Sequence, residues 1–344
     1  MDRPKDKDYI ETVEGLIFCV VGYLHPPDRY TAYLKYIPET SGKWGRGQRR
    51  YGRALAYYHV TQVEATYKLL EKQYSQYLYD CPIRGIRISA IPKSRVKRYY
   101  RPRERLRTIL RRGPLDPLEA KLLSLIELLS RASGLKASDF GVTGSLLLGI
   151  HNPKFSDIDL TVYGLEASRR VMEALRRGVD GLEAPSEGWL KDWSRRRAGR
   201  LPLSLEKLME IALRRWNQGF YEDTYFSIHP VRSDEEITEQ YGSRIYRRLG
   251  QVEGEATIID ASEGIYTPAI YRVEDTSIRG EIVVDEIKEI VSYEGIFSGI
   301  FQEDERIGFK GILERVEGEG EKYYRIVVGA ASSDGGYIKL LTED

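Results

Sequence analysis

The pattern of hydrophobic positions is clearest in residues 113–249. Leucine and isoleucine recur every three or four positions after Pro117, which predicts an amphipathic helix that ends near Gly134. Asp116 can cap the first turn of this helix. The apolar positions that follow predict strands at 140–143, 157–163 and 225–231, and helices at 146–150, 165–177 and 205–216. Strands therefore alternate with helices along this region.

The two flanking regions have different patterns. Residues 1–112 are rich in tyrosine, and they contain a predicted hairpin at 14–21 and 30–37, a helix at 60–79 and a strand at 86–91. Residues 250–344 have short strands whose spacing predicts a small all-β barrel or sandwich, at 255–259, 269–273, 296–301, 306–313 and 323–328. The sequence therefore predicts an α+β protein of three domains, 1–112, 113–249 and 250–344.

Composition narrows the class of protein. The 344 residues are 41% hydrophobic and 31% charged, so they can form buried cores. No apolar run reaches the roughly 18 residues that a membrane helix needs, and the first residues lack the apolar segment of a secretory signal. We therefore expect a cytoplasmic protein without a membrane partner, whose oligomeric state the sequence leaves open. Only two asparagines occur beside abundant arginine and glutamate, which favours a thermophilic source.

Charge is distributed unevenly, although the net charge is only +1. Residues 251–344 hold 9 Lys and Arg against 21 Asp and Glu, whereas residues 84–112 hold 12 Lys and Arg and a single acid. Basic clusters attract phosphates, and Tyr99 and Tyr100 within this stretch offer rings on which bases stack. A solvated basic surface has the same pattern. The candidate nucleic-acid contacts are Arg95, Lys97, Arg98 and Arg101.

Two aspartates stand out in the predicted strand 157–163. Residues two apart on a strand point to the same face, so the carboxylates of Asp157 and Asp159 share one face, while Ile158 and Leu160 share the other. Two like charges repel, and a divalent cation between them removes that repulsion. Mg²⁺ or Mn²⁺ prefers oxygen ligands and commonly takes one or two carboxylates together with substrate phosphates. Asp157 and Asp159 are therefore predicted metal ligands and catalytic residues.

A second motif precedes this pair. Gly144 and Ser145 follow the predicted strand 140–143 and begin a helix. Glycine allows the backbone to approach a phosphate closely, and backbone amides together with a serine hydroxyl can bind the anion. A phosphate site beside a metal pair is the combination that phosphoryl or nucleotidyl transfer requires.

The stretch resembles the nucleotidyltransferase superfamily of DNA polymerase β, poly(A) polymerases and CCA-adding enzymes. Gly144 and Ser145 match its Gly-Ser step, Asp157 and Asp159 match its metal pair, and Ser156 matches the small residue that often precedes the pair. The resemblance implies a polymerase β-like core, a mixed sheet with helices, in which Gly144, Ser145 and Ser156 bind an NTP, ATP for example. The whole chain also resembles predicted archaeal nucleotidyltransferases with extra N- and C-terminal domains.

One position departs from the superfamily pattern, which usually includes a third carboxylate on a later strand. In this chain that strand is predicted at 225–231, and Ser227 occupies the place of the acid. The third carboxylate helps to hold the catalytic metal and can accept the proton of the attacking hydroxyl. A nearby turn can supply a substitute from Glu222, Asp223 or Asp234, and His229 shares the face of Ser227. The sequence leaves open whether catalysis is retained.

These features favour a metal-dependent nucleotidyltransferase that moves NMP from an NTP to an acceptor hydroxyl, with RNA as the favoured acceptor. Two alternatives remain open. One is nucleotidyl transfer to a small molecule or a protein, and the other is a non-catalytic nucleic-acid-binding module that lacks the third carboxylate. The acidic C-terminal region is a poor surface for a nucleic-acid backbone, so we expect it to contact another protein or the basic half of the chain.

Overall fold

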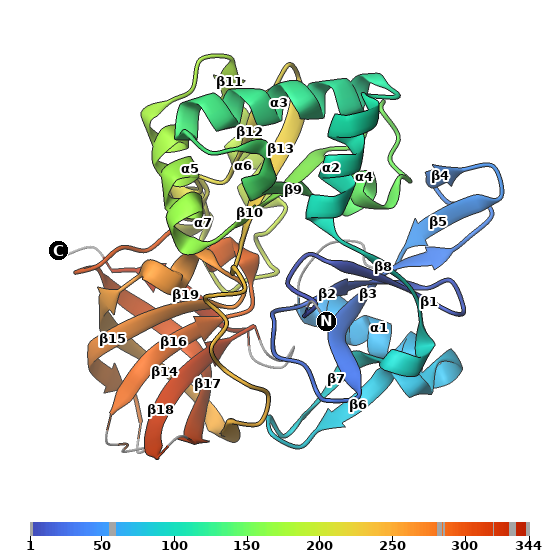
Figure 1. The fold of residues 1–344 in the computed structure, drawn as a ribbon. Coiled ribbons are helices and arrows are strands. Elements are labelled where there is room, and N and C mark those ends of the chain that lie inside the picture. The colour runs from blue at the N-terminus through green and yellow to red at the C-terminus, as the bar shows by residue number, and fades with distance from the viewer. Residues whose placement is uncertain are drawn as a thin grey trace. The chain divides into compact units, whose positions relative to one another are not determined.

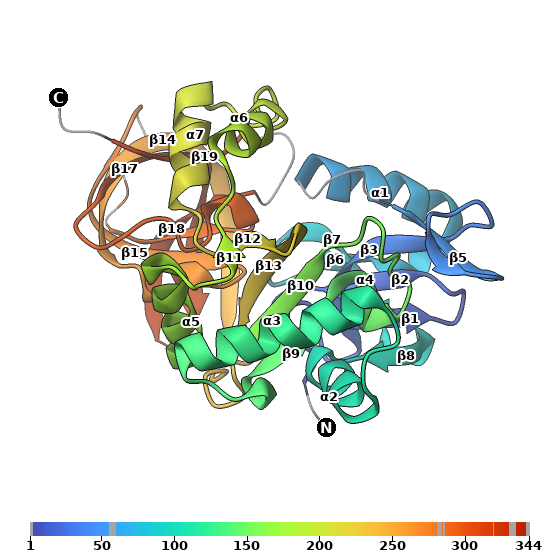
Figure 2. The same ribbon diagram turned by 90° about the horizontal axis from the view of Figure 1, so that it is seen from above.

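The computed structural model describes residues 3–54, 60–280, 284, 286–318, 320–329 and 335–341. It is an α+β protein with several sheets, which confirms the predicted class (Figures 1 and 2). The contacts within the chain form two compact units. Unit 1 comprises Met1–Ala56, Ser89–Pro185 and Trp216–Thr238, and unit 2 comprises Tyr57–Ile88, Ser186–Arg215 and Glu239–Asp344.

These units differ from the three consecutive domains expected from the sequence. Residues 186–215, which we placed in the middle domain, form helices α6 (Glu187–Arg195) and α7 (Leu205–Arg214) of unit 2. Their apolar side chains, including those of Trp193, Leu208 and Ile211, are buried in the core of the C-terminal sheet. Periodicity shows that a helix has an apolar face, but it does not show which sheet covers that face.

The first sheet of unit 1 carries residues of the N-terminal segment to the site described below. Its strand order is β4-β5-β3-β2-β1-β8, and β7 also pairs with β3. The bounds are β1 Tyr9–Thr12, β2 Ile17–Val20, β3 Arg29–Pro38, β4 Trp44–Arg46, β5 Arg49–Arg53, β7 Ile86–Pro92 and β8 Val96–Tyr100. The predicted hairpin is present as β2 and β3, which pair antiparallel with Cys19 opposite Tyr33.

The second sheet of unit 1 holds the predicted metal ligands. Its order is β11-β12-β13-β10-β9, with β10 parallel to β13 and antiparallel to β9. The bounds are β9 Phe140–Val142, β10 Ile158–Tyr163, β11 Leu182–Glu183, β12 Gln218–Tyr221 and β13 Thr224–Val231. The mixed sheet expected for the middle of the chain is therefore present.

Helices cover one face of this second sheet. Those of unit 1 are α2 Pro102–Arg112, α3 Pro117–Ser133, α4 Gly144–Leu148 and α5 Leu165–Arg177. Asp116 caps α3 by accepting hydrogen bonds from two backbone amides, and Gly134 ends it in the left-handed conformation, as the sequence predicts. Ile158, Leu160 and Val162 of β10 are buried in one core with apolar residues of α3 and α5. The opposite face of β10 is left for polar side chains.

Unit 2 contains a closed ring of five strands. Strand β14 pairs with both β15 and β17, which completes the order β14-β15-β16-β18-β17, and β19 adds to β17. The bounds are β14 Arg244–Asp260, β15 Ala269–Ile278, β16 Ile287–Ser292, β17 Arg306–Gly318, β18 Glu321–Val328 and β19 Tyr337–Leu340. Of the two architectures expected for residues 250–344, this ring is a barrel. Unit 2 also includes α1 Val60–Gln73 and β6 Leu78–Cys81.

One predicted strand of the C-terminal region is wrong. Residues 296–301 do not form a strand but begin within a 3-10 turn at Gly295–Phe297, and Phe297, Ile300 and Phe301 are buried in the core. A short apolar run looks the same in a strand and in a buried turn, which explains the error. No helix in the described part of the chain is long and apolar enough to span a membrane.

Candidate functional site

The aspartate pair lies where β10 begins. Asp157 directly precedes the strand and Asp159 is its second residue, so only Asp159 is within the strand. Ile158 and Leu160 are fully buried, whereas both aspartates are half-buried. This alternation leaves the aspartates on the face of the sheet opposite the helices, as predicted.

The electrostatics of the pair are those of two neighbouring carboxylates. Repulsion by Asp159, together with burial, raises the pKa of Asp157. Burial also opposes ionisation of Asp159, but contacts with His229 and Ser227 hold the pKa of that carboxyl well below its usual range. At neutral pH the site therefore holds an ionised Asp159 beside an Asp157 whose charge is disfavoured. A cation between the two would relieve this repulsion.

Gly144 packs directly against the carboxylate of Asp159. A Cβ atom added to Gly144 would lie 2.4 Å from Asp159 Oδ2, and the φ of Gly144 is +65°, which also favours glycine. The amide of Thr143 donates to the backbone carbonyl of Asp159 at 2.9 Å. The turn that begins α4 is therefore fixed against the first carboxylate of the strand, and Ser145 beside it is buried.

Ser156 makes hydrogen bonds within the loop that leads into β10. Its hydroxyl accepts a hydrogen bond from the amide of Asn152 at 2.9 Å, and its own amide donates to the carbonyl of Asn152. Ser156 thus closes the loop that leads into β10. These contacts give it a structural role in presenting the two aspartates.

Ser227 lies beside Asp159, as the predicted third strand requires. The parallel register of β10 and β13 pairs the two residues, and Ser227 Oγ donates to Asp159 Oδ1 at 2.5 Å. The same hydroxyl oxygen lies 2.9 Å from His229 Nε2, which is 3.8 Å from Asp159 Oδ1. Because the hydroxyl proton of Ser227 is donated to Asp159, the hydroxyl oxygen accepts a hydrogen bond from Nε2 of His229.

Two of the three acids considered as substitutes for the third carboxylate, Asp223 and Asp234, form ion pairs with lysines. Asp223 is exposed in the turn before β13 and pairs with Lys121 at 2.5 Å, and the carbonyl of Glu222 accepts from the same lysine. Asp234 pairs with Lys5 at 2.7 Å. Within the described residues, no group of three or more His, Cys, Asp or Glu side chains is arranged to hold a metal ion. The pair therefore offers two carboxylates, the number that Mg²⁺ takes when phosphates complete its shell.

Sequence reasoning missed the cations that face this pair. Lys35 of β3 is close enough to attract Asp159, although burial lowers the pKa of its amine. Lys35 and Arg53 also counteract the raised pKa of Asp157. The signal that could have indicated Lys35 is its position inside a strand, between Leu34 and Tyr36, which are both buried. These cations come from the N-terminal sheet, which the sequence assigned to a separate domain.

The basic residues proposed for nucleic-acid binding lie at β8 and just outside its two ends. Arg95 pairs with Glu14 at 3.4 Å, Lys97 with Glu11 at 2.9 Å and Arg101 with Glu104 at 3.1 Å. Arg98 has no acidic partner among the described residues, and its guanidinium lies 4.7 Å from the ring centroid of Tyr100. The four residues thus share one strand region, but internal acids neutralise three of them.

The fold and the site define an α+β protein with a paired-carboxylate site at the start of a parallel strand. The chain is 33% identical over 340 residues to the uncharacterized protein MJ1086 of Methanocaldococcus jannaschii, and the alignment covers 97% of this chain and 98% of that protein. This chain therefore belongs to the same family as that archaeal protein. No protein-family model matches the chain, and no solved structure matches it.

Proposed function

We propose that this protein is a metal-dependent nucleotidyltransferase that transfers a nucleoside monophosphate from an NTP to an acceptor hydroxyl. The observation that carries the proposal is the contact between Gly144 and the carboxylate of Asp159, beside the repelling carboxylate of Asp157. It joins the turn that begins α4 to the carboxylate pair proposed to bind the metal. The mixed sheet, with β10 parallel to β13 and antiparallel to β9, supports a polymerase β-like core.

Each residue of the site has a role in this proposal. Asp157 and Asp159 would hold Mg²⁺, which supplies positive charge beside the triphosphate when bound. The backbone at Gly144 and the hydroxyl of Ser145 would contact the β- and γ-phosphates. Lys35 adds positive charge on the side of the N-terminal sheet. The acceptor hydroxyl would attack the α-phosphorus, and pyrophosphate would leave.

RNA is the proposed acceptor. The support is the basic stretch at 84–112, which belongs in large part to the same compact unit as the aspartate pair. Arg98 has no internal acidic partner among the described residues and can neutralise a phosphate without breaking an ion pair. A small-molecule or protein acceptor would not need this excess of positive charge.

A second candidate function is nucleic-acid binding without catalysis. Ser227 favours it, because a hydroxyl occupies the position beside Asp159 at which a third carboxylate would stand. A neutral hydroxyl binds a divalent cation more weakly than a carboxylate does and is a weaker proton acceptor. In this case the protein would bind nucleotide and RNA but would transfer nothing.

Calorimetry with ATP and Mg²⁺ tests the binding site. Asp157→Asn combined with Asp159→Asn should abolish Mg²⁺-dependent ATP binding while thermal unfolding shows an intact fold. Asp180→Asn removes one carboxylate from an exposed loop and serves as the control, which should bind as the wild type does. Unchanged ATP binding in the double variant would overturn the proposed site.

A second assay separates transfer from binding alone. Wild-type protein is incubated with an RNA oligonucleotide and the four NTPs labelled at the α-phosphate. Incorporation that the double aspartate variant lacks supports the transferase. RNA binding and NTP binding without incorporation favour the non-catalytic module, and incorporation into a small molecule or into protein excludes RNA as the acceptor.

A further inference from the structure

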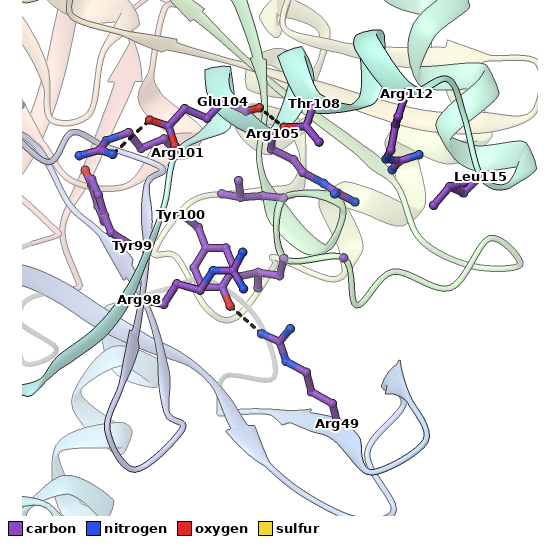
Figure 3. Close-up of a pocket in the computed structure, with 13 residues that line it drawn as sticks. Arg49, Arg98, Tyr99, Tyr100, Arg101, Glu104, Arg105, Thr108, Arg112 and Leu115 are labelled. Carbon is purple, nitrogen blue, oxygen red and sulfur yellow. Dashed lines mark hydrogen bonds and ion pairs between the residues drawn. The ribbon is translucent and has the colours of Figure 1, made fainter.

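A pocket of about 460 Å³ lies in unit 1 beside strand β8 and helix α2, and the segment 147–149 at the end of α4 also lines it. Five arginines line it: Arg49, Arg98, Arg101, Arg105 and Arg112. Figure 3 shows Arg105 and Arg112 extending from α2 and Arg49 from β5 toward the same space. The volume is within the range of small-molecule sites. Neither aspartate of the metal pair lines this pocket.

One buried acid orients the two arginines of α2 that line the pocket. Glu119 is 1% exposed and accepts from Arg112 with both carboxylate oxygens, at 2.6 and 2.7 Å. Arg105 donates to the same carboxylate at 3.1 Å and to the carbonyl of Leu146 at 3.0 Å. Burial, together with repulsion from Arg112 and Arg98, lowers the pKa of Arg105. A single carboxylate therefore fixes two guanidiniums that still repel each other.

The opposite side of the pocket is also short of negative charge. Arg49 donates to the hydroxyl of Tyr100 at 2.6 Å and pairs at 3.3 Å with Glu11, which Lys97 shares. Arg98 lies over the ring of Tyr100 and has no acidic partner in the described part of the chain. When the pair of Arg101 and Glu104 is included, three carboxylates face six cations in and around the pocket. The carboxylates are those of Glu11, Glu104 and Glu119. A bound anion would balance this excess of positive charge.

Part of the remaining lining is apolar. Leu115, Leu147 and Leu148 line the pocket beside the guanidiniums, together with the polar side chains of Glu104 and Thr108. Arginine forks match the oxygens of a phosphate, and a planar base can lie on an apolar or guanidinium surface. A carboxylate or inorganic phosphate would use the charge but leave the apolar side uncovered.

We propose that this pocket binds the monophosphate group of a nucleotide, with the base against the leucines. The nucleotide is either a free nucleoside monophosphate or the phosphorylated end of an RNA strand, and both present the same chemistry. This inference goes beyond the proposed function, since binding here requires neither Asp157 and Asp159 nor a divalent metal.

Calorimetry in the presence of EDTA tests this inference on the full chain. AMP should bind and adenosine should not, because the phosphate supplies the interaction with the arginines. Arg98→Gln should weaken AMP binding at least tenfold and leave folding intact, since Arg98 is exposed and has no ion pair to lose. Arg111→Gln removes an exposed arginine of α2 that does not line the pocket, and this variant should bind AMP as the wild type does.

Two further ligands identify the source of the phosphate. A 5′-phosphorylated RNA hexamer and its 5′-hydroxyl counterpart are compared with AMP under the same conditions. Preference for the phosphorylated hexamer, lost in Arg98→Gln, assigns the pocket to an RNA end, whereas tighter AMP binding assigns it to the free nucleotide.

Two other results would overturn the proposal. One is that none of the phosphorylated ligands binds, or that Arg98→Gln and Arg111→Gln weaken binding equally. The other is that AMP binding disappears when Asp157→Asn and Asp159→Asn are combined, which would place AMP at the metal pair. The proposed transferase fails on different data, namely Mg²⁺-dependent ATP binding that survives in that double variant.

Discussion

Ser227 stands directly beside Asp159 on the neighbouring parallel strand, and its hydroxyl donates to Asp159 Oδ1 at 2.5 Å. Together with the larger effect of His229, this hydrogen bond holds the pKa of Asp159 low while adding no negative charge of its own. The position next to the pair is therefore filled by a neutral group. In the proposed metal site this arrangement would limit the affinity for a divalent cation, and it makes Ser227 the residue at which that site can be strengthened.

We expect Ser227→Asp to raise the affinity of the protein for Mn²⁺ about tenfold or more, because a third carboxylate joins the two that are present. The same change should lower the melting temperature in EDTA, since it adds a like charge beside Asp159. Calorimetry with Mn²⁺ and thermal unfolding with and without the metal measure both effects. Any transferase activity should rise with the metal affinity.

Ser227→Asn is the matched control for this prediction, because it adds similar volume without charge. It should not tighten Mn²⁺ binding. If Ser227→Asp folds but binds Mn²⁺ no more tightly than Ser227→Asn, the third-strand position does not face a metal site.

Gly144→Ala should disrupt the site. The new Cβ would meet Asp159 Oδ2 at 2.4 Å, and a φ of +65° is unfavourable for alanine. We expect a loss of about 1–3 kcal/mol in the free energy of unfolding, and at least tenfold weaker binding of ATP with Mg²⁺. Urea unfolding and calorimetry provide the two measurements.

Gly149→Ala separates the backbone effect from the contact with the aspartate. Gly149 has a φ of +66°, but the nearest atom to its added Cβ is Arg105 Nη2 at 3.6 Å. It should lose stability for backbone reasons alone and retain ATP binding. Equal loss of ATP binding in both variants would mean that the contact between Gly144 and Asp159 does not contribute to ATP binding.

Replacing Arg95, Lys97, Arg98 and Arg101 with glutamine should weaken RNA binding and flatten its dependence on salt. Arg98→Gln alone should lower the slope of log K against log salt by about 0.7–0.9, the value for one released counterion. The other three residues already pair with internal acids and should each contribute less. Fluorescence anisotropy at several salt concentrations measures the slope, and Arg169→Gln on the surface of α5 is the control. An unchanged slope in the fourfold variant would leave the stretch as a solvated basic surface.

The local pattern of the chain predicted three strands of the second sheet of unit 1, β9, β10 and β13, but not β11 and β12. The helix cap at Asp116 and the turn at Gly144 depend on short-range rules of capping and glycine conformation. The place of Ser227 beside Asp159 followed instead from the family resemblance, and the parallel register of β10 and β13 pairs the two residues. The α+β class followed from the same elements. The proposed chemistry of the pair remains a prediction, which the experiments above address.

The sequence could not predict how distant segments combine. Lys35 is close to the aspartate pair, although its strand lies more than 100 residues earlier in the chain. Residues 186–215 belong to unit 2, whereas the residues just before and after them in the sequence belong to unit 1. Such contacts depend on which apolar faces cover each other, and periodicity does not encode that choice. The arginine pocket was missed for the same reason, because Arg49 and Leu148 are far apart in the sequence.

A buried carboxyl group on the first strand region supplies a test that depends on pH. Asp8 is 5% exposed, and its carboxylate accepts hydrogen bonds from the amide of Lys5 and from the hydroxyl of Tyr99. Burial is the strongest influence and raises the pKa of Asp8 to about 7, although both hydrogen bonds oppose the rise. The folded protein therefore holds a proton on Asp8 at pH values where the unfolded chain releases it.

The sign of the effect on stability follows from this difference. Between about pH 4 and pH 7 the folded state binds more protons at Asp8 than the unfolded state does, so the contribution of Asp8 to stability falls as pH rises through this window. Asp8→Asn cannot ionise and should remove that fall. The difference in the free energy of unfolding between pH 5 and pH 8 should shrink by about 2–4 kcal/mol, because one pKa unit corresponds to about 1.4 kcal/mol. Urea unfolding at the two pH values measures the change.

Tyr99→Phe should act in the opposite direction, since losing a donor to the carboxylate raises the pKa of Asp8 further and makes stability fall more steeply with pH. An identical pH dependence in wild type and Asp8→Asn would show that Asp8 ionises in the folded protein as it does in the unfolded chain.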